Sequence, residues 1–297
     1  MSKPANTALQ ERGVELRALD LKGSQETIVS ALKDIGTVIS AIGPMEQLEQ
    51  IPLATAAKTA GVEKFLPCGA MPVVPVGIHV MRDLKEQVYN HVKRLRLPYT
   101  IVDVGWWYQL SFPELPSGKI DYAIAFKGHR IPGDGNMPTA LTNLRDIGPY
   151  IARIIQDDRT LNRMVLVYNE MWTWNQIYDT LEKLSGEKLP RERDSLADLE
   201  ERLAYAEEKL KKDPNDMLPA FVKIATQYVI SWDIRGDNTP ENAKYLGYLT
   251  SKELYPGMGF IKFRDYLQEV LDGKAKPVNP EMKDVREALF KAQRTEY

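Results

Sequence analysis

The sequence predicts an α/β fold in which a parallel β-sheet is covered by helices on both faces and is followed by a smaller, mainly helical part. Short apolar runs alternate with helical patterns over the first two-thirds of the chain, which is typical of βαβ units. The chain has 297 residues, which is enough to bury a sizeable core. Its 43% hydrophobic and 27% charged residues are ordinary values for a globular protein.

The first third of the chain supplies most of the predicted strands. An alternating apolar pattern predicts a strand over residues 14–19, and Ser24 is a suitable N-cap for the helix that follows. The predicted strands are residues 14–19, 37–42, 63–66 and 99–104. The predicted helices between them are residues 24–34, 45–60 and 79–96. Strands separated by such helices form a parallel sheet with both faces covered.

The pattern changes after Gly105, where aromatic residues and prolines indicate an irregular loop. Short strands are predicted at residues 122–126, 129–131 and 164–168, with a turn at 133–136 and a helix at 146–156. From Thr173 onward the chain is mainly helical, and an apolar stripe on one charged helix is formed by Leu196, Leu199, Leu203, Ala206 and Leu210. We expect one domain over residues 1–115, with strands added by segments around 120–170, and a helical domain over residues 170–297.

Charge and cysteine content exclude several classes of protein. The 39 Lys and Arg residues against 41 Asp and Glu give a net charge of −2, which argues against a nucleic-acid-binding protein. The single cysteine, Cys68, excludes an intrachain disulfide, and the histidines lie at no metal-like spacing, so no metal site is predicted. No apolar run is long enough to cross a membrane, and the N-terminus is polar. We therefore expect a cytoplasmic protein.

Small residues follow three of the predicted strands, at the edge where a doubly wound sheet binds its ligand. These strand ends contain Ala41, Ile42, Gly43, Pro67, Cys68, Gly69, Val104 and Gly105. A glycine after a strand is often only a turn, but three such ends in succession indicate a flat ligand that approaches the backbone. No G-x-G-x-x-G motif follows a convincing strand, and no P-loop is present.

Lys85 is the main candidate for acid–base chemistry. On its predicted helix it lies at the edge of the apolar stripe that contains Met81 and Val88. A lysine at the boundary of a buried face can reach into a cleft, where burial lowers its pKa and suits it to proton transfer. The alternative is a surface lysine whose aliphatic stem lies along apolar surface.

Other residues have both a functional and a structural interpretation. Asp103 could be a general base, but a structural hydrogen bond is favoured. Cys68 could be a nucleophile, but no base is evident near it and buried thiols are usually inert. His79 and His129 could bind substrate or make structural hydrogen bonds. A planar substrate could lie on tryptophans that otherwise pack in the core, namely Trp106, Trp107, Trp172, Trp174 and Trp232.

Several stretches match known motifs in a fixed order. They are residues 61–67 (GVEKFLP), 78–85 followed by 97–100 (LPYT), 133–136 (GDGN), 146–148 (DIG), 158–162 (DRTLN), 181–188 and 254–257 (LYPG). Over residues 13–270 the chain thereby resembles the NmrA-like and isoflavone-reductase-like proteins, which are atypical short-chain dehydrogenases/reductases, and it is most similar in character to fungal members.

The resemblance implies a Rossmann-like domain, a smaller substrate domain and NADP(H) as cofactor, with reduction of aromatic or phenolic natural products by hydride transfer. It places the family's lysine, which contacts the nicotinamide ribose and acts as acid and base, at Lys85. Met81 stands where typical short-chain dehydrogenases have tyrosine. The strand ends named above, together with Lys85, are expected to bind the cofactor, and Trp106, Trp107 and Trp172 the substrate.

The chain departs from the family at its N-terminus, because residues 1–12 resemble the segment that follows the family's second strand. We therefore expect a Rossmann-like sheet truncated at its N-terminus, without the glycine-rich loop, in which the strand at residues 14–19 lacks its usual neighbours. An added amphipathic helix is predicted within residues 275–297, with Val285, Leu289 and Phe290 on its apolar face.

Three functions stay open. The first is an NAD(P)H-dependent reductase acting on an aromatic or polyketide-like secondary metabolite, with a small molecule as its partner. The second is a cofactor-deficient regulatory or interaction protein, which would bind a protein partner through the charged helix at residues 194–212 or form a homodimer. The third is a non-redox cyclase or isomerase on the same fold.

Overall fold

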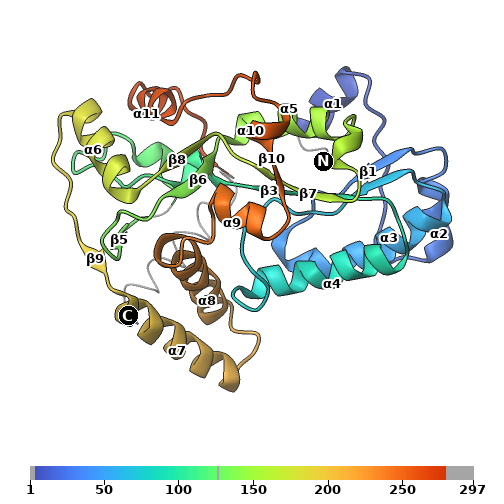
Figure 1. Ribbon diagram of the computed structural model, residues 1–297, viewed down its shortest axis with the longest axis horizontal. Coiled ribbons are helices and arrows are strands. Elements are labelled where there is room, and N and C mark those ends of the chain that lie inside the picture. Colours follow the sequence, from blue (N-terminus) through green and yellow to red (C-terminus); the bar gives the residue numbers. More distant parts are fainter. Residues whose placement is uncertain (1–3, 126, 279–297) are drawn as a thin grey trace.

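The computed structural model describes residues 4–125 and 127–278, and its main feature is a parallel sheet (Figure 1). The strands lie in the order β1, β2, β3, β7 and β10. Their bounds are Thr37–Ile39, Lys64–Leu66, Thr100–Val104, Arg163–Val167 and Leu249–Thr250. A bridge between Phe65 and Tyr99 joins β1 and β2 to the remaining strands. The predicted parallel α/β sheet is confirmed.

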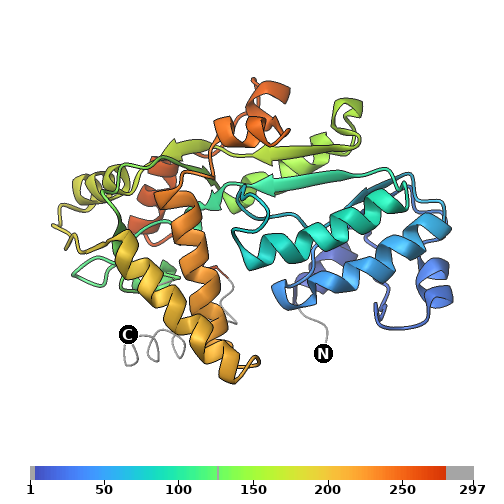
Figure 2. The same ribbon diagram turned by 60° about the horizontal axis from the view of Figure 1, so that its bottom comes forward.

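Helices cover both faces of this sheet, as Figures 1 and 2 show. Phe65 and Ile101 pack against α2 (Gln25–Ala31), α3 (Gln50–Thr59) and α4 (Val80–Arg94). The next residue of each strand, Leu66 or Val102, points to the opposite face and packs toward α5 (Leu144–Ile154), because side chains alternate along a strand. Burial on both faces explains why β2 and β3 are buried throughout.

The second part of the molecule is built on a smaller sheet, in which β6 pairs in parallel with β4 and antiparallel with β8. A further parallel pair is formed by β5 and β9. The bounds are β4 Trp106–Trp107, β5 Ile131–Pro132, β6 Thr139–Thr142, β8 Glu170–Trp172 and β9 Arg193–Asp194. The other helices are α1 Pro4–Glu11, α6 Trp174–Ser185, α7 Leu196–Lys212, α8 Met217–Val229, α9 Pro240–Tyr245, α10 Ser251–Leu254 and α11 Phe263–Leu271.

Short helical turns of other kinds connect these elements. A 3₁₀-helix at Pro44–Glu49 precedes α3, and a π-helix at Ile230–Ile234 continues α8. Further 3₁₀-helices lie at Tyr108–Leu110, Asp121–Ala123 and Asp158–Thr160.

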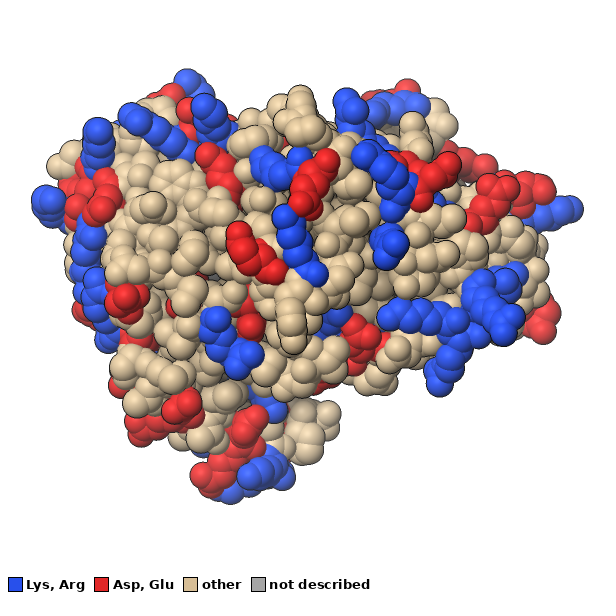
Figure 3. Space-filling view, in the orientation of Figure 1, with Lys and Arg blue, Asp and Glu red and all other residues tan. Residues whose placement is uncertain are grey.

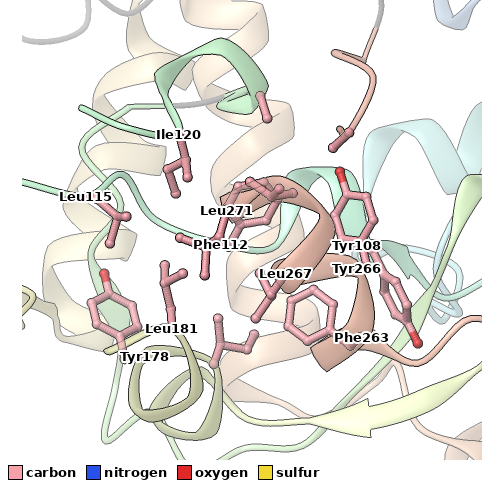
Figure 4. Packing of buried hydrophobic residues seen from close by; sticks show 14 of the residues in the cluster. Tyr108, Phe112, Leu115, Ile120, Tyr178, Leu181, Phe263, Tyr266, Leu267 and Leu271 are labelled. Atoms are coloured by element: carbon pink, nitrogen blue, oxygen red, sulfur yellow. The ribbon is translucent and has the colours of Figure 1, made fainter. Parts of the chain in front are cut away.

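A separate hydrophobic core holds the second part together (Figure 4). Tyr108 packs on Phe263 of α11 with ring centroids 4.7 Å apart, and Leu181 of α6 is fully buried in the same cluster. Helices α7 and α8 pack against each other and project from this part (Figure 2). Leu199 and Ala206 of the predicted apolar stripe are fully buried, whereas Leu196 is exposed.

Three local predictions are wrong. Residues 14–19 form no strand: Val14 and Leu16 are exposed, and the Arg17 side chain donates to the Ala31 carbonyl. An alternating pattern becomes a strand only where a neighbouring strand accepts its backbone hydrogen bonds, and none does so among the described residues. Residues 122–125 follow a 3₁₀-helix and an irregular path instead of a strand. The helix expected at residues 45–60 is divided, because the first turn is the 3₁₀-helix that ends at Glu49.

Other boundaries differ by a few residues. The helix predicted from residue 146 begins at Leu144, where the Asn143 side chain caps it by accepting the backbone N–H of Arg145. Ser24 is the N-cap of α2, as predicted. Most of the C-terminal extension, with Val285, Leu289 and Phe290, lies outside the described residues.

Charges of both signs are interspersed over the face seen in Figure 3. Within residues 4–125 and 127–278, no helix combines the length and the apolar character needed to cross a bilayer.

Candidate functional site

Helix α4 places Lys85 inside the molecule. The helix begins after His79, whose Nδ1 accepts the backbone N–H of Met81 at 3.0 Å and caps the first turn. Met81 and Val88 are buried, and Lys85 lies on the same side of the helix with 5% of its surface exposed. Lys85 is therefore not the surface lysine of the alternative interpretation.

The Lys85 ammonium is held by oxygen acceptors beside the carboxyl end of β2. Its Nζ donates to the Cys68 carbonyl at 2.6 Å and to Gln47 Oε1 at 2.9 Å, and Cys68 Sγ lies 4.0 Å away. Burial lowers the pKa of Lys85, while Cys68 and Asp103 oppose that shift. A lowered pKa is the property that proton transfer near neutral pH requires of a lysine.

Two buried glutamines connect Lys85 to the ends of β1 and β2. Gln47 donates through Nε2 to the Gly43 carbonyl at 2.7 Å, and Gln50 accepts the Cys68 backbone N–H at 2.6 Å. Gln50 also donates to the Gln47 carbonyl at 3.1 Å. Sequence reasoning missed both glutamines, because nothing in apolar periodicity distinguishes a buried glutamine from an exposed one.

The loop after β1 presents accessible backbone. Ala41 and Gly43 are exposed, Ile42 is half-buried, and the Ile42 carbonyl lies 3.7 Å from Cys68 Sγ. Directly before them, Ser40 Oγ is buried and has no hydrogen-bond partner. A buried hydroxyl without a partner is costly, so this position fits a ligand that hydrogen-bonds to it.

Close packing within the protein explains why glycine occupies positions 69 and 105 at the other two strand ends. A Cβ at Gly69 would lie 2.3 Å from the Val102 carbonyl oxygen, and one at Gly105 would lie 2.7 Å from the Ala140 carbonyl oxygen. Both positions therefore accommodate the protein's own strands. Their neighbours Pro67, Cys68 and Val104 are buried as well.

Asp103 has the structural role favoured from the sequence. Its Oδ2 accepts from Arg82 Nη1 at 3.1 Å and from the Tyr248 hydroxyl at 2.5 Å, and all three side chains are buried. Glu86 also accepts from Arg82, at 2.5 Å. This network shares helix α4 with Lys85, and it joins α4 to β3 and to the segment before β10.

A cavity of about 660 Å³ is lined by Trp106, which follows Gly105 at the end of β3. Aromatic rings meet on its wall: the centroid of Trp232 lies 4.3 Å from that of Trp106 and 4.7 Å from that of Tyr228. Tyr228 also lies 3.8 Å from the ring of His79. The N-terminus of the helix that carries Lys85 therefore contacts the cavity wall.

Polar groups lie among these aromatic rings. His129 lines the cavity with its ring 5.3 Å from Trp174. Burial lowers the pKa of His129 to about 4 against the opposing effect of Glu114, so the ring is neutral at pH 7. Asp233 also lines the cavity, and burial raises its pKa to about 7, against a hydrogen bond with Trp174.

The three tryptophans predicted to contact substrate lie in different places. Trp106 lines the cavity. Trp107 packs in the cluster between the main sheet and α5, and Trp172 packs on Phe263 at 5.1 Å, so neither is among the described residues that line the cavity. Tyr228 and Asp233 line it but were not predicted, because the pairing of α8 with the strand ends is a long-range contact that local patterns do not reveal.

Metal ligands are not clustered in the described part of the chain. No group of three or more His, Cys, Asp or Glu side chains there is arranged to hold an ion.

The comparisons with known proteins agree with this architecture. The model of the NmrA-like family matches residues 1–236. The chain belongs to the NmrA-like family. The resemblance inferred from the motifs at residues 61–67, 133–136 and 158–162 is confirmed.

Relatives of this NmrA-like chain are enzymes by name. Asnovolin J 5′,6′-dehydrogenase nvfM of Aspergillus novofumigatus is 44% identical over 276 residues, which cover 92% of this chain and 84% of that protein. The NADPH complex of leucoanthocyanidin reductase from Vitis vinifera has a TM-score of 0.74 at 22% identity, covering 92% of this chain and 88% of that one. AtPrR2 with NADP⁺ and (+)-pinoresinol has a TM-score of 0.71 at 20% identity, covering 89% and 84%. The two solved structures support the fold.

Proposed function

We propose that this NmrA-like chain is an NAD(P)H-dependent reductase that acts on an aromatic or polyketide-like secondary metabolite. The observation that carries the proposal is Lys85, a buried lysine with a lowered pKa at the carboxyl edge of the sheet. Its helix also contacts the aromatic wall of a cavity of about 660 Å³, a size suited to a small organic substrate. The dehydrogenase and reductase names of the relatives support the same reaction class.

The described residues fit the nicotinamide–ribose end of such a cofactor. Ser40 Oγ is a buried hydroxyl without a partner, and the backbone of Ala41 and Gly43 is accessible beside it. Lys85 Nζ carries three protons and donates two of them to oxygen acceptors. The sequence has no G-x-G-x-x-G loop for the diphosphate, so the fit rests on the strand ends and on Lys85.

In this proposal each group has a distinct task. When bound, NADPH supplies the hydride. Lys85 orients the ribose and transfers a proton at Nζ, and Gln47 and the Cys68 carbonyl hold the ammonium in place. The loop of Ala41, Ile42 and Gly43 lines the cofactor, the buried ends of β2 and β3 hold that loop and Lys85 in place, and the aromatic cavity excludes water from the substrate.

Calorimetric titration of NADPH and NADH into wild type and Lys85→Met tests the proposal. We expect micromolar binding of one dinucleotide to the wild type and at least tenfold weaker binding to Lys85→Met, since the variant keeps the stem but loses the donor. Lys58→Met is the matched control, because Lys58 lies on the surface of α3 and donates to the Arg96 carbonyl, away from Lys85. Absence of wild-type binding up to millimolar concentrations contradicts the proposal.

A cofactor-deficient interaction protein is the second candidate. The exposure of Thr37 and Ile39 on strand β1 favours it. It predicts no dinucleotide binding, so the same titration separates the two functions.

A further inference from the structure

The π-helix after α8 brings two polar groups to the cavity together. Trp232 and Asp233 lie within Ile230–Ile234, and both line the cavity although only 4% and 8% of their surfaces are exposed. Single-turn π-helices are rare and occur frequently at functional sites. Two consecutive buried residues, one with a donor and one with an acceptor in its side chain, therefore line the same cavity.

One polar atom of each residue has no partner among the described residues. Trp232 Nε1 and Asp233 Oδ1 are buried without a hydrogen bond, although the Asp233 carboxyl group also hydrogen-bonds with Trp174. Leaving such atoms unpaired destabilises the protein, and it does so more strongly for a charged group. The cost is recovered when a ligand supplies the missing partner.

The cations that line the cavity are engaged elsewhere. Arg130 pairs with Glu192 and Asp194, Arg202 pairs with Asp194 at 3.0 Å, and Lys127 pairs with Asp121 at 2.9 Å. His129 is neutral at pH 7, for the reason given above. The basic groups that line the cavity are therefore paired with other carboxylates or uncharged.

A hydroxyl group is the ligand chemistry that satisfies both atoms. It donates one hydrogen bond and accepts others, whereas an ether only accepts and a ketone only accepts. We propose that Trp232 and Asp233 form a specificity subsite for a hydroxyl group of the aromatic substrate, with Trp232 Nε1 donating to its oxygen and Asp233 Oδ1 accepting its proton. This inference rests on the proposed function for the identity of the cavity as the substrate site.

The subsite predicts discrimination against O-methylated ligands. Above its pKa of about 7 the Asp233 carboxylate can only accept, so the probes are compared at pH 8. A methyl ether then still accepts from Trp232 but leaves Asp233 Oδ1 unpaired and places a methyl group against it. Sites built to hydrogen-bond a hydroxyl reject analogues that lack it far more strongly than apolar pockets reject a missing methylene. We expect at least tenfold tighter binding of the hydroxyl compound.

Two matched pairs of probes test this directly by calorimetry: (+)-pinoresinol against its di-O-methyl ether, and 2-naphthol against 2-methoxynaphthalene. In the wild type the hydroxyl member of at least one pair binds at least tenfold more tightly than the ether. Asp233→Leu removes the acceptor and keeps a side chain that branches at the γ carbon, so the preference falls to less than threefold. Trp232→Phe removes the donor together with one ring of the indole, so both members of the pair weaken together and the preference persists.

Asp179→Leu on the exposed face of α6 is the matched control and leaves the preference unchanged. Asp233→Asn serves where Asp233→Leu does not fold, and it is expected to lower the preference without abolishing binding. A wild type that binds neither hydroxyl probe, or that binds both ethers as tightly, overturns the subsite, as does an unchanged preference in the Asp233 variant that folds. NADPH is titrated in parallel so that the subsite and the proposed reductase are tested separately. A protein that does not bind NADPH but still prefers the hydroxyl compound contradicts the reductase and not the subsite.

Discussion

His79 connects a helix cap, an aromatic wall and a second helix through one imidazole ring. Its Nδ1 accepts the Met81 backbone N–H at 3.0 Å, and its Nε2 lies 3.2 Å from the Ile224 carbonyl of α8. A carbonyl can only accept, so Nε2 carries the proton and the ring is neutral. Burial lowers the pKa of His79 to about 4. Protonation of Nδ1 would remove the acceptor that caps α4.

This arrangement predicts acid sensitivity. Because the pKa of His79 is about 4 in the folded protein and about 6.5 when unfolded, the unfolded state binds more protons between these values, and stability falls as the pH drops from 6.5 to 4. Between pH 6.5 and pH 4, we expect the free energy of unfolding of His79→Gln to fall by about 2–3 kcal/mol less than that of the wild type. Urea unfolding at pH 7 and pH 4.5 measures the difference.

His91→Gln is the control for that experiment. His91 is only partly buried and its Nε2 lies 2.8 Å from Thr55 Oγ1, so its substitution should change the pH dependence less. Equal pH dependence of wild type and His79→Gln would contradict the role of this histidine.

Single residues were predictable where their position along a helix or strand decides their environment. Lys85 is buried because it lies beside the apolar stripe of α4, and Asp103 is buried because it lies inside β3. Gln47 and Asp233 could not be predicted in the same way. Their burial depends on which distant elements pack on them, and that depends on the whole fold.

At the scale of elements, the junction between β2 and β3 depends on a missing side chain. A Cβ at Gly69 would lie 2.3 Å from the Val102 carbonyl oxygen, which belongs to a strand that cannot move aside. We expect Gly69→Ala to destabilise the protein by about 2–4 kcal/mol through overpacking. Gly148→Ala on the exposed side of α5 meets nothing within 4 Å apart from its chain neighbours. Its gain in helix propensity is offset because the next residue, Pro149, disfavours the helical conformation of a residue with a Cβ, so we expect a change within about 0.5 kcal/mol.

Thermal and urea unfolding of the two variants provide the comparison. A Gly69→Ala protein as stable as Gly148→Ala would show that the β2–β3 junction relaxes easily.

Helices and strands were predicted correctly where the sequence pattern within the element is enough to determine its structure. Helix α4 and strand β3 were correctly located because a 3.6-residue stripe and a continuous apolar run are local signals. Residues 14–19 show an equally regular alternation, yet they form no strand in the structure. A strand needs a partner far away in the sequence, and the alternation of residues 14–19 contains no information about one.

At the scale of the whole molecule, a buried charge joins three distant segments. Arg82 of α4, Asp103 of β3 and Tyr248 before β10 form a hydrogen-bonded group with all side chains buried. Removing the Asp103 charge leaves Arg82 only partly compensated, by Glu86 at 2.5 Å. We expect Asp103→Asn to cost about 1–3 kcal/mol in urea unfolding, and the double variant Arg82→Met with Asp103→Leu to recover part of that loss, since it leaves only the partly exposed Glu86 without its partner.

Tyr248→Phe separates the contributions within this group. It removes two hydrogen bonds, the one that Tyr248 donates to Asp103 at 2.5 Å and the one that it accepts from Arg82 at 2.8 Å, and it leaves the ion pair, so a loss of about 1–3 kcal/mol is expected. A double variant that is no more stable than Asp103→Asn would argue against an uncompensated charge as the cause.

The contact between His79 and Tyr228 has a further consequence for how the two proposed ligands act on each other. His79 and Lys85 are less than two turns apart on one helix, so a substrate that orders Tyr228 also restricts the motion of the lysine. Coupling between two sites is reciprocal: whatever factor substrate adds to cofactor affinity, cofactor adds to substrate affinity. We therefore expect substrate affinities measured on the protein alone to be weaker than those in the working ternary complex.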